Sequence, residues 1–251
     1  MADTSQPLFF DPTAAGVDVK EKPRRKRDLL EFAVAYGLIA LAVWTPRPWQ
    51  QGVSLAALLW VILTTWISFD GWRVMGFRVA RFWRAWWVLG VVAVLVAAAI
   101  GVAAWLETLH VPHFPDLFLE RYWAYTVWSF LQEFLLLNFF LLRLLRLISN
   151  RTTAIVTATT LFALVHLPNP VLTPLTLIWG CAACLIFLHY RNIYVPALSH
   201  AILGICIAIT IPGPIDHNMR VGLGYLTYRE HRGHPNDQRV SEAKSTTPYR
   251  Q

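Results

Sequence analysis

Long apolar runs, separated by short polar or basic stretches, occupy most of the chain between residues 29 and 211. A helix that crosses the hydrocarbon core of a membrane needs about 20 predominantly apolar residues. Seven runs are candidates, with approximate bounds 29–44, 52–69, 86–106, 122–142, 152–166, 175–188 and 195–211. The pattern predicts an all-α, polytopic integral membrane protein with about six to eight transmembrane helices.

The polar stretches divide the chain into three parts. Residues 1–28 are expected to form a disordered, basic, cytoplasmic N-terminus, residues 29–212 a transmembrane helical domain, and residues 213–251 a basic polar tail. The cluster EKPRRKR before the first run places the N-terminus in the cytoplasm, because basic loops stay inside. A seventh span would then put the basic tail outside. Either the last segment is re-entrant or short, or the number of spans differs by one.

Composition excludes a soluble globular protein. The chain is 56% hydrophobic and 15% charged, whereas soluble domains carry about 25% charged residues. The net charge of +7 is spread over the ends and the loops, which favours anionic lipid headgroups as partners and does not favour nucleic acid. In residues 70–87, arginines alternate with aromatic residues, as in an interfacial helix. We expect the protein in a bacterial inner (plasma) membrane.

In the apolar runs between residues 122 and 211, the ionisable side chains other than Cys and Tyr are Glu133, His166 and His200. Such a group costs at least about 2.5 kcal/mol in a membrane helix, so it usually faces a partner or a cavity. The three runs together therefore predict a shared interior site. A carboxylate with imidazoles can hold a metal ion that activates water, or the carboxylate can act directly as a general base. In a purely structural role, Glu133 would only tie helices together.

The order of these residues resembles the CPBP family, the CAAX-protease and bacteriocin-processing (Abi) membrane metalloproteases. That family has EExxxR, FxxxH and HxxxN on three successive helices. In this chain LFALVH provides Phe162 and His166, SHAILG provides His200, and LQEFLLLN holds Glu133. The resemblance covers about residues 120–212 and implies a CPBP-like core. It also implies an endopeptidase with Glu133, His166 and His200 as catalytic residues, and Zn²⁺ or another divalent metal on His166 and His200.

The chain departs from the family pattern at two motifs. Depending on the alignment, Glu133 keeps one of the paired glutamates, and the Arg position falls on Leu137 or Asn138. Asn138 follows Glu133 by five residues, about 140° around an ideal α-helix, so we expect it on another face. The Asn of HxxxN falls on Gly204, which could permit close helix packing.

These departures leave three functional hypotheses. The first is a divergent intramembrane endopeptidase, a hydrolase acting on a membrane-attached polypeptide. The second is a non-catalytic scaffold or assembly subunit of a membrane protein complex on the same fold. The third is a proton-coupled transporter that uses Glu133 and His166 as a relay.

Overall fold

The computed structural model describes residues 21–110 and 115–228, and every regular element in these ranges is a helix. The all-α prediction is therefore confirmed. In chain order the elements are α1 Glu21–Trp44, α2 Arg47–Ile67, η2 Val79–Arg81, α3 Phe82–Ala85, α4 Trp87–Trp105, α5 Pro115–Glu133, η3 Phe134–Leu141, α6 Leu142–Leu147, α7 Arg151–Leu164, α8 Leu172–Tyr190, α9 Tyr194–Thr210, α10 Gly213–Asp216 and α11 Gly222–Leu226.

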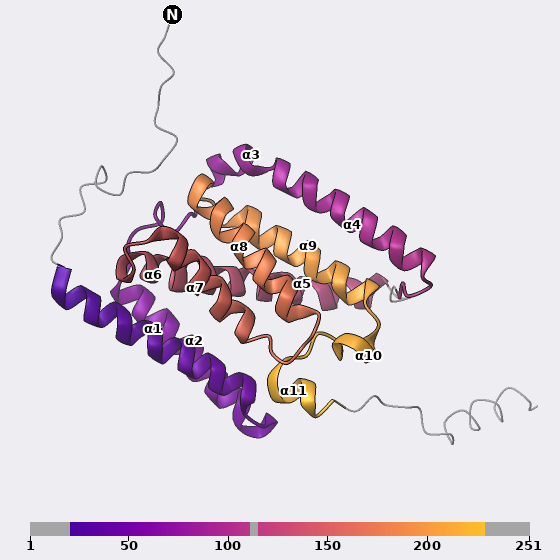
Figure 1. Cartoon of the computed structure of the whole chain (residues 1–251), viewed down its shortest axis with the longest axis horizontal. Helices are drawn as coiled ribbons and strands as arrows, with labels where there is room; N and C mark the ends of the chain where they lie inside the picture. The colour runs from indigo at the N-terminus through magenta and orange to yellow at the C-terminus, as the bar shows by residue number, and fades with distance from the viewer. Residues whose placement is uncertain (1–20, 111–114, 229–251) are drawn as a thin grey trace, which may run out of the picture.

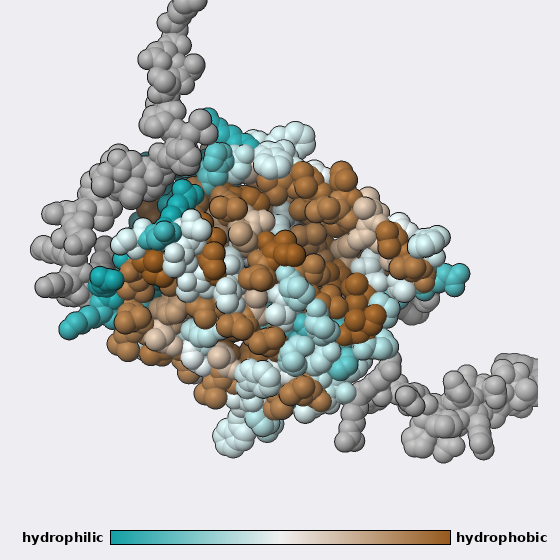
Figure 2. All heavy atoms as spheres, viewed as in Figure 1, coloured by the Kyte–Doolittle hydropathy of each residue, from teal (hydrophilic) through white to brown (hydrophobic). Residues whose placement is uncertain are grey.

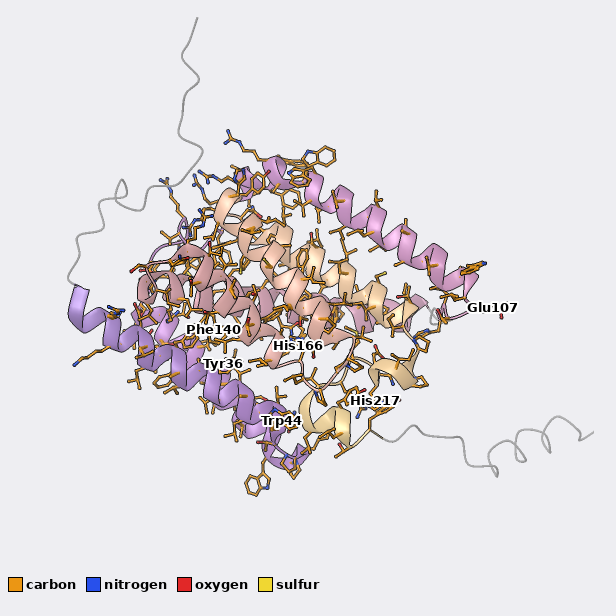
Figure 3. All side chains as sticks on the ribbon, viewed as in Figure 1. Tyr36, Trp44, Glu107, Phe140, His166 and His217 are labelled. Carbon is orange, nitrogen blue, oxygen red and sulfur yellow. The ribbon has the colours of Figure 1, made fainter. Side chains whose placement is uncertain are left out.

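The helices pack as pairs around the continuous segment α5–η3–α6 (Figure 1). Helices α1 and α2 form one hairpin, and α7 and α8 form a second. Helix α9 packs against both α5 and α4, so it lies between the centre and the edge of the bundle. Tyr36 of α1 and Phe140 of η3 meet edge to face, with ring centroids 6.1 Å apart, where the first hairpin joins the centre (Figure 3).

Among the helices of residues 21–110 and 115–228, three are long and apolar enough to cross a membrane: α2, α4 and α8. Helix α9 is apolar but shorter, at 17 residues. Hydrophobic side chains cover much of the face seen in Figure 2, and many large ones are exposed, including Trp66 and Trp105. So much exposed apolar surface would be unfavourable in water, but it is favourable in contact with lipid acyl chains. The protein is an integral membrane protein with a membrane helical fold.

The two polar ends are more ordered than the sequence predicts. Residues 21–28, expected to be disordered, are the first turns of α1. Residues 213–228 were expected to be tail, but they contain α10 and α11, and α11 packs against α1. The Gly222 N–H donates to the Leu167 carbonyl at 2.7 Å, which ties this segment to the turn after α7. The predictions for residues 1–20 and 229–251 lie outside the described residues.

The basic segment between α2 and α4 is not one interfacial helix. It consists of turns followed by the short elements η2 and α3. The Asn192 side chain donates to the Arg78 carbonyl at 2.8 Å, and the Ile193 N–H donates to the Gly76 carbonyl at 3.1 Å. These bonds hold the segment against the start of α9, because the turns leave backbone groups that need partners.

A buried ladder of ion pairs joins α1 to α6. Arg143 donates to Glu31 at 2.7 Å through Nη2 and at 3.1 Å through Nε. About one turn away on each helix, Arg146 forms a two-bond pair with Asp28 at 2.8 and 2.9 Å. Arg146 also donates to Asp70 at 2.8 Å. The carboxylates are three residues apart on α1 and the arginines three apart on α6, so each pair shares one helix face. The ladder fixes the first hairpin against the centre.

Candidate active site

Glu133 is the last residue of α5 and is fully buried, with 0% of its surface exposed. Its Oε1 atom accepts two hydrogen bonds, from Trp179 Nε1 at 2.7 Å and from His200 Nδ1 at 2.8 Å. The donors lie on α8 and α9, so the carboxylate joins three helices. The sequence predicts that Glu133 lies close to the two histidines. In the structure it bonds directly to one of them, His200.

The bond to Glu133 fixes the orientation of the His200 ring, with Nδ1 directed at Oε1. The His200 side chain is itself 9% exposed, and the edge of the Trp179 ring lies against it, with centroids 6.4 Å apart. The carboxylate and the indole therefore fix the orientation of this imidazole, as second partners do for catalytic histidines.

His166 belongs to the same region but does not bond to Glu133. It lies in the turn after α7, where its Nδ1 donates to the Phe162 carbonyl at 2.7 Å and its Nε2 is 3.5 Å from the Gln132 amide nitrogen. The Phe162 ring contacts both imidazoles edge-on, with centroids 5.0 Å from His166 and 6.1 Å from His200. His166 is buried and is labelled in Figure 3. The spacing of FxxxH thus places an aromatic ring against both histidines.

The arrangement does not fit a metal ion held by three protein ligands. In residues 21–110 and 115–228, no group of three or more His, Cys, Asp or Glu side chains is placed to hold one. Both imidazoles use Nδ1 in hydrogen bonds, so Nε2 is the only nitrogen that each could offer. Metal binding by His166 and His200 stays a prediction.

Gly204 is the position where the family pattern has an asparagine. Tyr125 of α5 fills the space instead, because a Cβ atom at position 204 would overlap the Tyr125 phenol. Helices α5 and α9 pack closely here, which agrees with the predicted role of this glycine in close helix packing. Tyr125 and Trp179 were both missed by sequence reasoning, since neither lies in a motif.

The helix changes its geometry directly after Glu133. Residues Phe134–Leu141 form a π-helix, in which hydrogen bonds join residues five apart. Residues five apart therefore stack along the helix, and Asn138 lies one π-turn beyond Glu133. The expectation that Asn138 faces another direction assumed an ideal α-helix, and this segment does not have that geometry. Leu137, the other candidate for the Arg position, is fully buried in the apolar core.

The fold and this site define an all-helical integral membrane protein with a buried carboxylate–histidine pair. Residues 114–206 match the model of the family described as type II CAAX prenyl endopeptidase Rce1-like. This segment contains Glu133, His166 and His200, and the match supports the CPBP family assignment and a CAAX-type intramembrane protease fold. Comparisons with curated proteins and with solved structures gave no significant match.

Proposed function

We propose that this protein is an intramembrane endopeptidase that hydrolyses a peptide bond in a membrane-attached polypeptide. The observation that supports this most is the buried hydrogen bond between Glu133 and His200. An ionisable pair inside a membrane protein usually marks a functional site, because burial is costly unless it serves a purpose. The family match covers the same residues.

In the proposed reaction Glu133 is the general base. Its Oε2 atom takes a proton from a water molecule while the water oxygen attacks the carbonyl carbon of the scissile bond. His200 and Trp179 both hold Oε1, so they keep Oε2 directed at the water. When the tetrahedral intermediate collapses, the C–N bond breaks and the proton on Glu133 passes to the leaving nitrogen. His166, which contacts the same Phe162 ring as His200, orients the water or the substrate.

The membrane setting of this reaction is also a proposal. The substrate enters laterally or from the cytoplasmic face, and the basic segment between α2 and α4 contacts anionic headgroups. The protein resides in a bacterial inner membrane. Its N-terminus lies in the cytoplasm, because the cluster at residues 21–27 is basic. Protease digestion of a tag on the N-terminus, in inverted and in right-side-out vesicles, tests this orientation.

The test of the activity uses full-length protein in phosphatidylethanolamine–phosphatidylglycerol vesicles. The probes are two internally quenched peptides ending in Cys-aliphatic-aliphatic-X, one farnesylated on the cysteine and one anchored by an N-terminal acyl chain. Loss of a general base lowers the rate by about 10²–10⁴-fold, so Glu133→Gln is expected to lose hydrolysis of whichever peptide is cleaved. His166→Ala and His200→Ala are expected to lose most of it.

Exposed residues of the same types provide the controls. Glu107 and His189 are both exposed and lie outside the site, so Glu107→Gln and His189→Ala should hydrolyse the peptide at the wild-type rate. Hydrolysis that persists in all three site variants would show that the proposed function is wrong. Metal content of the purified protein, compared with a His166→Ala/His200→Ala double variant, tests the predicted metal site.

A scaffold role is the second candidate, and the contact between Tyr125 and Gly204 favours it. At this position the family motif has an asparagine side chain, and here the Tyr125 phenol packs into that space instead. A stoichiometric membrane partner that co-purifies equally with wild type and with Glu133→Gln would support the scaffold.

A further inference from the structure

Two buried polar side chains of the central segment, Glu133 and Asn138, have polar atoms without a hydrogen-bond partner among the described residues. Glu133 Oε2 and both polar atoms of the Asn138 amide make no hydrogen bond within the described residues. Both side chains are buried, with exposed fractions of 0% for Glu133 and 5% for Asn138. Buried polar groups in folded proteins nearly always have a partner, and an unpartnered one is costly. The two groups therefore indicate a bound polar ligand.

The π-helix places these groups on one side of the chain. Its hydrogen bonds join residues five apart, so Asn138 stacks one turn beyond Glu133. A helical turn rises on the order of 5 Å. One water molecule spans such a separation, because it makes hydrogen bonds of about 2.8 Å to each side. Buried waters typically bond to two to four otherwise unsatisfied polar groups.

We propose that Glu133 Oε2 and the Asn138 side chain hold one buried water molecule, and that this water is the nucleophile of the proposed hydrolysis. The inference rests on the proposed function for the role of the water, but not for its presence. One water hydrogen points at Glu133 Oε2, which takes that proton as the oxygen attacks the substrate carbonyl. The other hydrogen donates to Asn138 Oδ1 and stays on the oxygen. Asn138 is thus a positioning residue for the water.

The π-helix gives this proposal its specificity. With α-helical geometry from Glu133 to Leu141, Asn138 would turn about 140° away from Glu133, and no single water could bridge the two. π-helical turns occur frequently at functional sites. Here the extra residue per turn brings the neutral amide of Asn138 one turn beyond the Glu133 carboxylate. An acidic or apolar side chain at this position would not orient water in the same way.

A double-mutant cycle of thermal unfolding in detergent tests the water site without any substrate. The variants are Glu133→Gln, Asn138→Leu and the combination of both. If one water joins the two side chains, Asn138→Leu lowers the Tm by about 2–8 °C. The double variant then loses clearly less than the sum of the single losses, because residues that share a partner are coupled. Additive losses would overturn the proposal.

Thr65 provides the matched control. Its hydroxyl is also without a hydrogen-bond partner among the described residues, but it lies on α2, outside the site. Thr65→Val removes that hydroxyl with little change of shape and should leave the Tm unchanged or raise it. If Asn138→Leu also raises the Tm, Asn138 is only an unpartnered amide and the proposal is wrong.

The kinetic part of the test separates this proposal from the proposed function. With the quenched peptides, Asn138→Leu should lower kcat at least about tenfold and leave KM unchanged, since a water-positioning residue acts in the chemical step. An unchanged kcat would overturn the role of Asn138. If wild-type protein cleaves neither peptide, the proposed function fails for these substrates, while the unfolding cycle still decides whether the water is bound.

Discussion

The ladder between α1 and α6 predicts a large loss of stability when one of its charges is removed alone. In Glu31→Leu, Arg143 stays buried, with its side chain only 4% exposed, and loses both of its bonds to Glu31. It keeps a bond to the Phe139 carbonyl at 3.2 Å and its stacking on the Phe139 ring at 3.7 Å. Neither of these contacts neutralises its charge.

The magnitude follows from the cost of an uncompensated buried charge. Removing one partner of a buried pair costs about 3–5 kcal/mol. For a protein of this size, each kcal/mol lowers the Tm by about 2–4 °C, so Glu31→Leu is expected to lower the Tm by about 6–20 °C. The double variant Glu31→Leu/Arg143→Met removes both charges, and it should recover most of that loss because two apolar side chains replace the pair.

Thermal unfolding of purified protein in detergent measures these differences, with Arg27→Ala as the control. Arg27 also contacts Glu31, at 3.3 Å, but its side chain is 43% exposed, and exposed pairs contribute about 0–1 kcal/mol. If Glu31→Leu costs no more than Arg27→Ala, or if the double variant is no better than the single one, the ladder is not a desolvated ion pair and the reasoning is refuted.

Two further predictions concern the periphery of the site. Gly204→Ala should lower the Tm, because the new Cβ overlaps the Tyr125 phenol and overpacking costs about 1–3 kcal/mol. Gly101→Ala, in a helix with open space around it, should raise the Tm instead, and equal effects at both positions would contradict the packing argument. Burial raises the pKa of the Asp216 carboxyl, so the folded state binds this proton more tightly than the unfolded state, and stability falls as the pH rises through the raised pKa. Asp216→Asn should therefore be more stable than wild type at pH 7 in chemical denaturation, and this advantage should shrink below about pH 4; an advantage that grows on acidification would contradict the sign.

Most of the helix positions could be predicted from the sequence, because a membrane helix needs a continuous apolar run. The predicted runs 86–106 and 195–211 correspond to α4 and α9 within one residue at either end. The central run, 122–142, was too short, since the continuous helical segment from α5 through α6 extends from Pro115 to Leu147. The last turns of this segment contain Arg143 and Arg146. Charged residues normally end a predicted membrane helix, and the sequence does not show that these two arginines have buried carboxylate partners.

The ion pairs of the ladder could have been predicted from the spacing of charged residues in the sequence. Asp28 and Glu31 share one spacing, and Arg143 and Arg146 share the same spacing in a distant segment. Matched intervals of opposite charge in two apolar helices indicate that the helices pair, because each set lies on one face. The π-helix left no such signal, since its register depends on packing against other helices, and no local residue pattern requires it.

The two departures from the family motifs have different physical consequences. At position 204 the missing side chain is replaced by Tyr125, so the space is filled and the helices α5 and α9 stay close. At the carboxylate, the donors to Oε1 are a neutral indole and an imidazole in place of a fixed positive charge. A guanidinium would place a full positive charge beside the carboxylate, whereas these donors mainly fix its direction. Within the part of the chain that the structure describes, Glu133 is therefore held on Oε1 and has no partner on Oε2, and the proposed general base needs such a free oxygen to take a proton from water.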